Sequence, residues 1–110
     1  MQNNLHKTLI VDLQKGFGKL KINKAKNVYV TSNLTSIAKI RIPKKDKLSI
    51  ILNVLKNVMG KNYTIFSPSA SMNLCNTNLV FDIKKTASYE MGPLAEFVRI
   101  QKNSTRSLHP

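Results

Sequence analysis

Two short β-branched segments separated by an apolar helical segment restrict the fold of this chain more than any other feature. Residues 27–31 and 63–66 each predict a strand, the first of them buried on both faces, and the stripe over 46–59 predicts the helix between them. Strands joined through a helix pair in parallel by a right-handed crossover. A further apolar stripe over about 8–20 predicts a helix that precedes this unit. We therefore expect an α/β fold with a partly parallel sheet and flanking helices.

Residues that cap helices or break strands predict where these segments begin and end. Gly16 and Gly18 indicate that the first helix stops near them, and Asp46 is a candidate N-cap for the second helix. Gly60 suits the position just after that helix. The polar run 67–71, with Pro68, ends the second strand.

The remaining third of the chain has a weaker pattern. Residues 72–85 are expected to form loop, with Leu79–Phe81 as a candidate short element, and helical spacing resumes over 92–100 before a polar turn at 102–105. We find no internal repeat and no composition shift. The 110 residues are therefore expected to form a single domain.

The chain is strongly basic, which favours anionic partners. Its 18 Lys and Arg residues against 5 Asp and Glu residues give a formal net charge of +13 and a pI near 10.2. Lysine and asparagine are scattered throughout, a usage that also fits AT-rich coding with lysines on ordinary solvated faces. A small basic nucleic-acid-binding module is therefore an alternative function. The aromatic residues lie inside predicted strands and helices and no module motif is present, so nucleic acid is not the expected partner.

Cysteine, histidine and apolar content exclude several classes of protein. One cysteine permits no intramolecular disulfide, and with two histidines it makes a metal site in this chain improbable. No signal-peptide pattern and no apolar run of about 20 residues is present. We expect a cytoplasmic protein with no metal and no membrane partner.

A hydroxyl-rich loop follows the first predicted strand. Ligands of parallel α/β sheets bind at the carboxyl ends of strands, and hydroxyl and amide groups suit a phosphate or a pantetheine amide. The candidate residues are Ser32, Asn33, Leu34, Thr35 and Ser36. A solvated turn is the alternative. No dinucleotide-binding or phosphate-loop glycine motif occurs.

A second candidate segment contains Arg106, Ser107 and His109. Arginine offers a planar fork to phosphate or carboxylate, and histidine can transfer a proton near neutral pH. By residue type alone, a histidine near a terminus is more often simply solvated. Glu96 lies on a predicted helix, where a carboxylate usually forms part of the polar face.

Together these segments resemble, in order along the chain, the N-terminal part of the aminoglycoside 3-N-acetyltransferase family. The first similar segment is Val28–Ser36, and the second, Gly60–Ser69, is similar to a glycine-rich, hydrophobic and Pro-Thr stretch of the family. The most specific similarity is Met91-Gly92-Pro93-Leu94-Ala95-Glu96 followed by Arg106-Ser107-Leu108-His109-Pro110, which matches the region of the family's Arg-Ser-x-His-Pro motif.

The resemblance implies the N-terminal portion of a mixed α/β acyltransferase domain that uses acetyl-CoA as acyl donor. It places Ser32, Asn33, Leu34, Thr35, Ser36, Arg106, Ser107 and His109 at the coenzyme. The acceptor would be the amino group of an aminoglycoside or a related amino sugar. Thr31-Ser32-Asn33 replaces a His-Ser-Ser or His-Ala-Ser found in many members, which fits an acceptor other than an antibiotic, such as a sugar of surface-polysaccharide synthesis.

The resemblance also implies that the chain is an N-terminal fragment. The family's catalytic residues follow the Arg-Ser-x-His-Pro motif, so the catalytic residues are unknown here and the isolated chain is expected to be inactive. A third interpretation is an interaction protein formed by decay of such an enzyme. Its incomplete sheet would expose an unpaired edge and apolar surface, and the chain would then oligomerise or aggregate.

Overall fold

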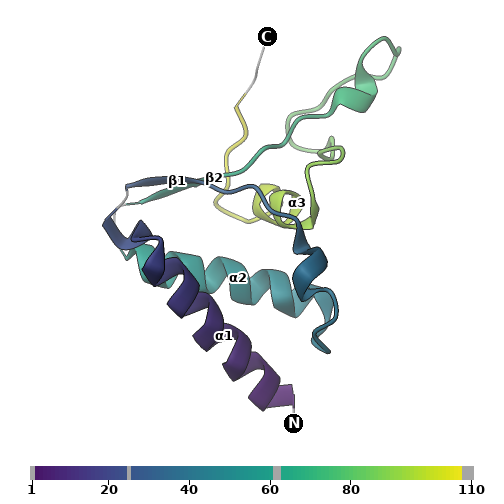
Figure 1. Cartoon of the computed structure of the whole chain (residues 1–110). Helices are drawn as coiled ribbons and strands as arrows, with labels where there is room; N and C mark the ends of the chain where they lie inside the picture. The colour runs from purple at the N-terminus through teal and green to yellow at the C-terminus, as the bar shows by residue number, and fades with distance from the viewer. Residues whose placement is uncertain (1, 25, 61–62, 108–110) are drawn as a thin grey trace. The chain divides into compact units, whose positions relative to one another are not determined.

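The computed structural model describes residues 2–24, 26–60 and 63–107, which divide into two compact units (Figure 1). Unit 1 comprises Met1–Tyr29 and Leu34–Phe66, and unit 2 comprises Val30–Asn33 and Ser67–Pro110. The chain therefore crosses from one unit to the other more than once. The expectation of a single domain over residues 1–110 stays a prediction.

Unit 1 contains the predicted parallel strand pair. Strand β1 (Asn27–Tyr29) pairs in parallel with β2 (Thr64–Phe66), so that Val28 lies opposite Ile65. Helix α2 (Lys44–Met59) lies between the two strands in the chain. The α/β class and the helical connection between parallel strands are thereby confirmed.

Helix α2 carries the apolar core of unit 1 on one face. Its buried apolar residues recur at intervals of three and four and are Leu48, Ile51, Leu52, Val54, Leu55 and Met59. The predicted N-cap is wrong: the helix begins at Lys44, and the N–H of Lys47 bonds to the carbonyl oxygen of Pro43 at 3.0 Å, so Pro43 is the N-cap residue. Asp46 lies in the first turn instead, where its negative charge complements the helix dipole.

A lysine is buried at the start of α2. Lys47 is 8% exposed, and its Nζ donates a hydrogen bond of 3.2 Å to the carbonyl oxygen of Ala38. This bond ties α2 to the segment just after η2, the 3₁₀ turn Leu34–Ile37. The second half of the predicted hydroxyl-rich loop is therefore helical and belongs to unit 1.

Helix α1 (Gln2–Lys19) packs on α2 and is longer than predicted. It begins at Gln2 rather than at Thr8. Within this extra length, Thr8 Oγ1 donates a hydrogen bond to the Asn4 carbonyl oxygen, and His6 Nε2 lies 3.5 Å from Asp46 Oδ2 on α2. It ends at Lys19, next to Gly18, so the predicted stop near the two glycines is confirmed, and both glycines lie inside its last turns. Contact with α2 offsets the roughly 0.5–1 kcal/mol that each glycine costs inside a helix.

The strands are not buried on both faces, which corrects the prediction for residues 27–31. Tyr29 is 65% exposed and its cross-strand partner Phe66 is 48% exposed, while Val28 and Ile65 are half-buried. Among the described residues the sheet has two strands, and α1 and α2 lie on one side of it within unit 1 (Figure 1). Helices on one side cover one face, so Tyr29 and Phe66 lie on the face that unit 1 leaves open.

Unit 2 has little regular structure. It contains the 3₁₀ turn η3 (Met72–Leu74) and the predicted helix, α3 (Pro93–Arg99), in which Leu94 and Ala95 are buried. Residues 79–81 form no regular element and are exposed, whereas the predicted polar turn after α3 is present at 102–103. Within the described ranges, no helix combines the length and apolar character needed to cross a membrane.

The core prediction can be tested at Leu55, which is 4% exposed. Leu55→Ala is expected to lower the free energy of unfolding by about 2–5 kcal/mol, because it removes apolar contacts and leaves a cavity. The exposed Asn53 on the same helix gives a control, and Asn53→Ala should change the value by less than about 0.5 kcal/mol. Urea denaturation followed by circular dichroism measures both. Equal effects would contradict the assignment of this helix face to the core.

Two glycines predict stability changes of opposite sign. Gly60 ends α2 with a φ of 76°, and Gly16 is helical; an added Cβ meets nothing within 4 Å at either position. Gly16→Ala should therefore stabilise the protein by about 0.5–1 kcal/mol. Gly60→Ala should destabilise it by about 1–2 kcal/mol, since a Cβ is disfavoured at positive φ. Thermal unfolding of the two variants compares them directly, and a stabilising Gly60→Ala would contradict this backbone conformation.

Candidate functional site

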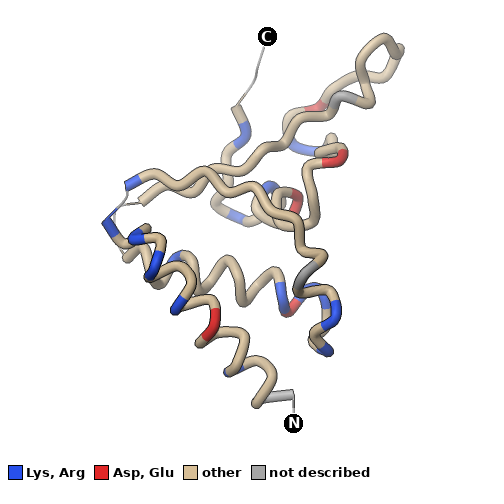
Figure 2. Tube along the Cα trace, viewed as in Figure 1, with Lys and Arg blue, Asp and Glu red and all other residues tan. Residues whose placement is uncertain are grey.

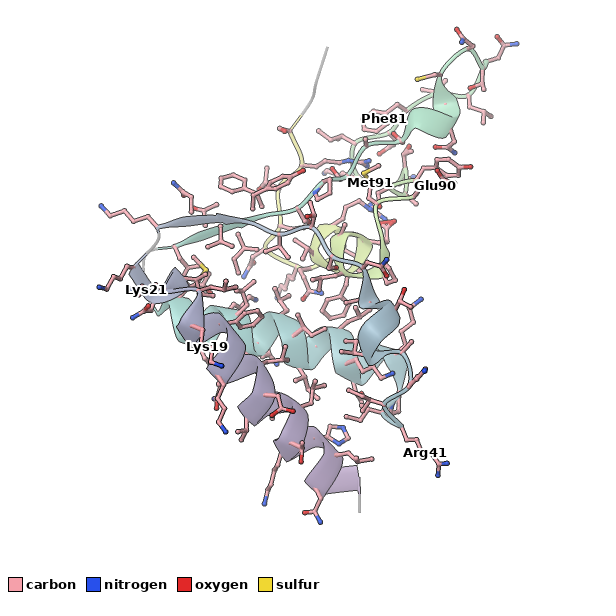
Figure 3. All side chains as sticks on the ribbon, viewed as in Figure 1. Lys19, Lys21, Arg41, Phe81, Glu90 and Met91 are labelled. Carbon is pink, nitrogen blue, oxygen red and sulfur yellow. The ribbon has the colours of Figure 1, made fainter. Side chains whose placement is uncertain are left out.

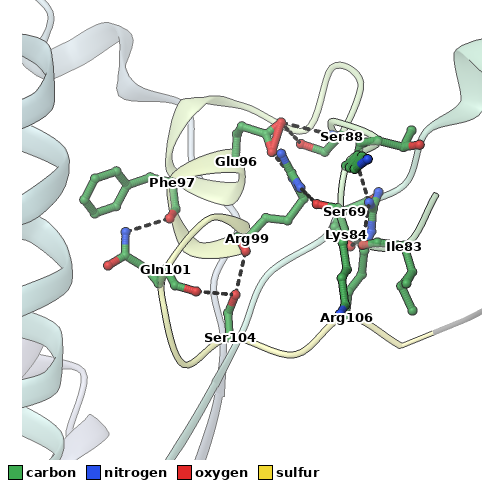
Figure 4. Close-up of polar contacts among 12 residues, drawn as sticks. Ser69, Ile83, Lys84, Ser88, Glu96, Phe97, Arg99, Gln101, Ser104 and Arg106 are labelled. Atoms are coloured by element: carbon green, nitrogen blue, oxygen red, sulfur yellow. Dashed lines mark hydrogen bonds and ion pairs between the residues drawn. The ribbon is translucent and has the colours of Figure 1, made fainter.

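The guanidinium of Arg106 joins three separate segments of unit 2 (Figure 4). Its Nε donates to Ser69 Oγ at 3.2 Å, and its Nη2 donates to the carbonyl oxygen of the same serine. Its Nη1 donates to the carbonyl oxygens of Thr86 and Ile83, the latter at 3.5 Å. One side chain thus connects the segment after β2, the loop over 83–86 and the segment after α3.

The same guanidinium lies over an aromatic ring and is partly withdrawn from water. Its carbon is 4.7 Å from the ring centroid of Phe81, a cation–π geometry. Burial lowers the pKa of Arg106 below its usual value, the positive charge of Arg99 lowers it further, and Glu96 opposes both effects. Because arginine titrates so far above neutrality, the group stays charged at physiological pH.

Glu96 on α3 organises a second set of contacts beside the first (Figure 4). Its Oε2 accepts hydrogen bonds from the backbone N–H of Ser88 at 3.0 Å and from Ser88 Oγ at 3.2 Å. Its Oε1 accepts one from Arg99 Nε, and Arg99 Nη1 donates to the carbonyl oxygen of Lys84 at 3.1 Å. Glu96 was expected to be part of a polar helix face; it instead anchors the loop before the helix.

A close backbone approach connects the loop after β1 with the start of α3. Gly92 has a φ of 93°, and a Cβ built on it would lie 3.2 Å from the carbonyl oxygen of Ser32. A larger residue would both be strained and press against that carbonyl. The Met-Gly-Pro-Leu segment therefore lies against the hydroxyl-rich loop, within unit 2.

The predicted coenzyme residues fall in both units. Ser32, Asn33, Arg106 and Ser107 belong to unit 2, whereas Leu34, Thr35 and Ser36 lie in the η2 turn of unit 1. His109 lies outside the described residues. Within unit 2 the structure brings the Ser32 loop to Gly92, and Arg106 to Ser69.

Several groups that contact Arg106 or Glu96 in the structure were not among the predicted site residues. These are Ser69, Phe81, Thr86, Ser88 and Arg99. One signal for Ser69 was available: it follows the second strand of a parallel pair, as the predicted loop follows the first, and both carboxyl ends of such a pair are candidate ligand positions. The backbone acceptors at residues 83–86 have no sequence signal, because every residue has a carbonyl group.

The arrangement favours an anionic ligand. Two guanidinium groups and one carboxylate leave an excess of positive charge beside serine hydroxyls, which suits phosphate or carboxylate groups. The hydrogen bonds among described residues use most of the Arg106 donors, so this side chain shapes the site more than it offers a free fork. Across the described ranges, no group of three His, Cys, Asp or Glu side chains could hold a metal ion.

Comparison with known proteins adds no relative. No protein-family model, no curated protein and no solved structure matches the chain.

The role of Arg106 as a connector predicts a local effect of its removal. Arg106→Gln should increase amide hydrogen exchange at Thr86 and Tyr89, whose N–H groups bond to Asp82 and Ala70 in the connected loops. The α2 amides of unit 1 should exchange at unchanged rates. Lys102→Gln removes the same charge from an exposed position and is the matched control. Unchanged exchange at Thr86 and Tyr89 in Arg106→Gln would show that the connection does not stabilise these loops.

Proposed function

We propose that the chain forms the coenzyme-binding part of an acetyl-CoA-dependent N-acetyltransferase of the aminoglycoside 3-N-acetyltransferase type. The observation that supports this most is the bond between Arg106 and Ser69, 37 residues apart. This bond joins two of the four segments that resemble the family, the Pro-Ser stretch after β2 and the Arg-Ser-x-His-Pro stretch. The contact of Gly92 with the Ser32 loop joins the other two resembling segments.

The reaction would transfer an acetyl group to an amine. A neutral amine nitrogen attacks the thioester carbonyl carbon of acetyl-CoA, a general base accepts the amine proton, and the carbon–sulfur bond breaks to release the coenzyme thiolate. In the family, the residues that perform the proton transfer follow the Arg-Ser-x-His-Pro motif. The proposed contribution of residues 1–110 is therefore binding and orientation of the coenzyme rather than turnover.

The residues of the proposed coenzyme site have two different roles: some position the loops, and others contact the coenzyme. Arg106 fixes the loops around it, since its donors are largely used by backbone carbonyls. Of the residues that the resemblance places at the coenzyme, Ser32, Asn33 and Ser107 lie in unit 2 with Arg106. Their hydroxyl and amide groups are proposed to contact the pantetheine and phosphates of the coenzyme. The positive charge of Arg99 and Arg106 contributes attraction for the phosphates.

The acyl acceptor proposed is the amino group of an aminoglycoside or a related amino sugar. Both the antibiotic and a sugar of polysaccharide synthesis fit a cytoplasmic enzyme that uses acetyl-CoA. The Thr31-Ser32-Asn33 sequence departs from the pattern of many family members, and this departure favours the sugar of polysaccharide synthesis.

Coenzyme binding is the direct test. Titration calorimetry of the 110-residue chain with acetyl-CoA at physiological salt should show saturable binding. Asn33→Ala should weaken it by about threefold to tenfold, because the loss of one hydrogen bond costs about 0.5–1.5 kcal/mol. Arg106→Ala should abolish it by releasing the loops. Lys102→Gln tests charge alone and should bind as the parent chain does. No saturable binding by the folded parent chain would contradict the proposal.

A further inference from the structure

The basic charge of the chain is concentrated in unit 1. Thirteen of the 18 Lys and Arg residues and two of the 5 acidic residues belong to unit 1, a formal charge of +11, whereas unit 2 carries +2. Scattered lysine usage across solvated faces would divide the charge roughly by length. The uneven division shows that the net charge of +13 is mainly a property of one folded unit.

Within unit 1, five lysines gather over the last turns of α1 and the segment that leads to β1. All five side chains are exposed: Lys15, Lys19, Lys21, Lys24 and Lys26. Figure 2 shows basic residues grouped where α1 ends and the strands begin, and Lys19 and Lys21 extend outward from that end in Figure 3. In residues 13–28 no acidic residue interrupts this basic segment, so its field is of one sign.

The open face of the sheet adds a pair of aromatic side chains. Tyr29 and Phe66 lie directly opposite each other on adjacent strands, and both are about half exposed or more. Side chains at directly opposed positions point to the same face, with strands about 4.8 Å apart. Two aromatic rings therefore stand next to each other on a face that unit 1 leaves uncovered.

The aromatic pair and the basic segment are close enough along the chain for one extended polyanion to contact both. Lys26 directly precedes β1, and its carbonyl oxygen accepts a hydrogen bond of 2.8 Å from Thr64 N, so it lies at the start of the strand pair. Tyr29 is three residues further, or about 10 Å along a strand.

We propose that unit 1 binds single-stranded nucleic acid, with phosphates on the lysines of the basic segment and bases stacked on Tyr29 and Phe66. Exposed aromatic rings beside lysines are the two components by which proteins bind single strands without sequence preference. A duplex keeps its bases stacked and cannot use the rings. Nucleic acid was not the expected partner, because the aromatic residues were expected to lie inside strands and helices and no module motif is present; Tyr29 and Phe66 are nevertheless exposed.

Fluorescence anisotropy tests the proposal with a labelled 12-nucleotide oligo(dT) and a duplex of the same length. The full chain should bind the single strand more tightly than the duplex, and raising salt should weaken that binding steeply. Tyr29→Ala and Phe66→Ala should each weaken single-strand binding by about fivefold or more. Tyr29→Phe and Phe66→Tyr keep a ring and should restore it. Circular dichroism verifies that each variant is folded.

Matched variants in units 1 and 2 test whether binding depends on this surface or only on the total charge and aromatic content of the chain. Lys24→Gln with Lys26→Gln should weaken binding and reduce the salt slope by about 1.4, the value for two phosphate contacts on a single strand. Lys84→Gln with Lys85→Gln makes the same charge change on exposed lysines of unit 2 and should have little effect. Tyr89→Ala removes an aromatic side chain that is 44% exposed in unit 2 and should also have little effect.

Three results would overturn the proposal. The first is equal binding of single strand and duplex with no effect of Tyr29→Ala or Phe66→Ala, which would leave charge alone. The second is displacement of the oligonucleotide by vesicles containing anionic phosphatidylserine but not by neutral vesicles, which would identify a membrane surface. The third is displacement by acetyl-CoA, which would make this surface part of the proposed coenzyme site. Loss of coenzyme binding in the unit 2 variants leaves the oligonucleotide result unaffected, so the two proposals fail separately.

Discussion

Burial of one face of α2 is the interaction on which unit 1 depends, because this helix carries most of its apolar core and is the chain connection between the two strands. The apolar stripe of α2 contributes most of the buried apolar residues, and α1 and the 3₁₀ turn η1 (Ile22–Lys24) pack on α2. Parallel strands need a long connection, and here the connection is itself the core element. The ends of β1 and β2 then deliver the two loops from which unit 2 is built.

Unit 2 is stabilised mainly by polar contacts rather than by an apolar core. Its buried apolar residues are few, and its long loops are fixed by the polar contacts of Arg106 and Glu96. Such contacts are directional, so they can set the position of a loop that has no regular hydrogen-bond ladder. A planar guanidinium with five N–H groups is suited to this task because it reaches several carbonyls at once. The cost is a partly buried charge that is balanced by carbonyl dipoles, the Phe81 ring and the nearby carboxylate of Glu96.

Sequence periodicity was sufficient to predict the helices and strands, but not which of their faces are exposed or which tertiary contacts they make. The apolar stripe of α2, the β-branched run 27–31 that contains β1 and the helical spacing over 92–100 are local signals. The first two predicted the α/β class and the parallel pair correctly, and the third predicted α3. The exposure of Tyr29 was missed because a β-branched run has the same pattern whether helices cover one face of the sheet or both. The role of Arg106 was identified only as an anion-binding group, since bonds to backbone carbonyls at residues 83 and 86 depend on tertiary contacts. The coenzyme, acceptor and catalytic assignments remain proposals.

The short segment Val30–Asn33 belongs to unit 2 although the chain on both sides of it belongs to unit 1. During synthesis these four residues leave the ribosome well before Gly92, whose backbone lies against Ser32. At the usual elongation rate the interval is about 3–12 s for some sixty residues, far longer than helix or loop formation. Unit 1 can therefore form while this segment still lacks its partners, so its contact with Gly92 is expected to form last during synthesis.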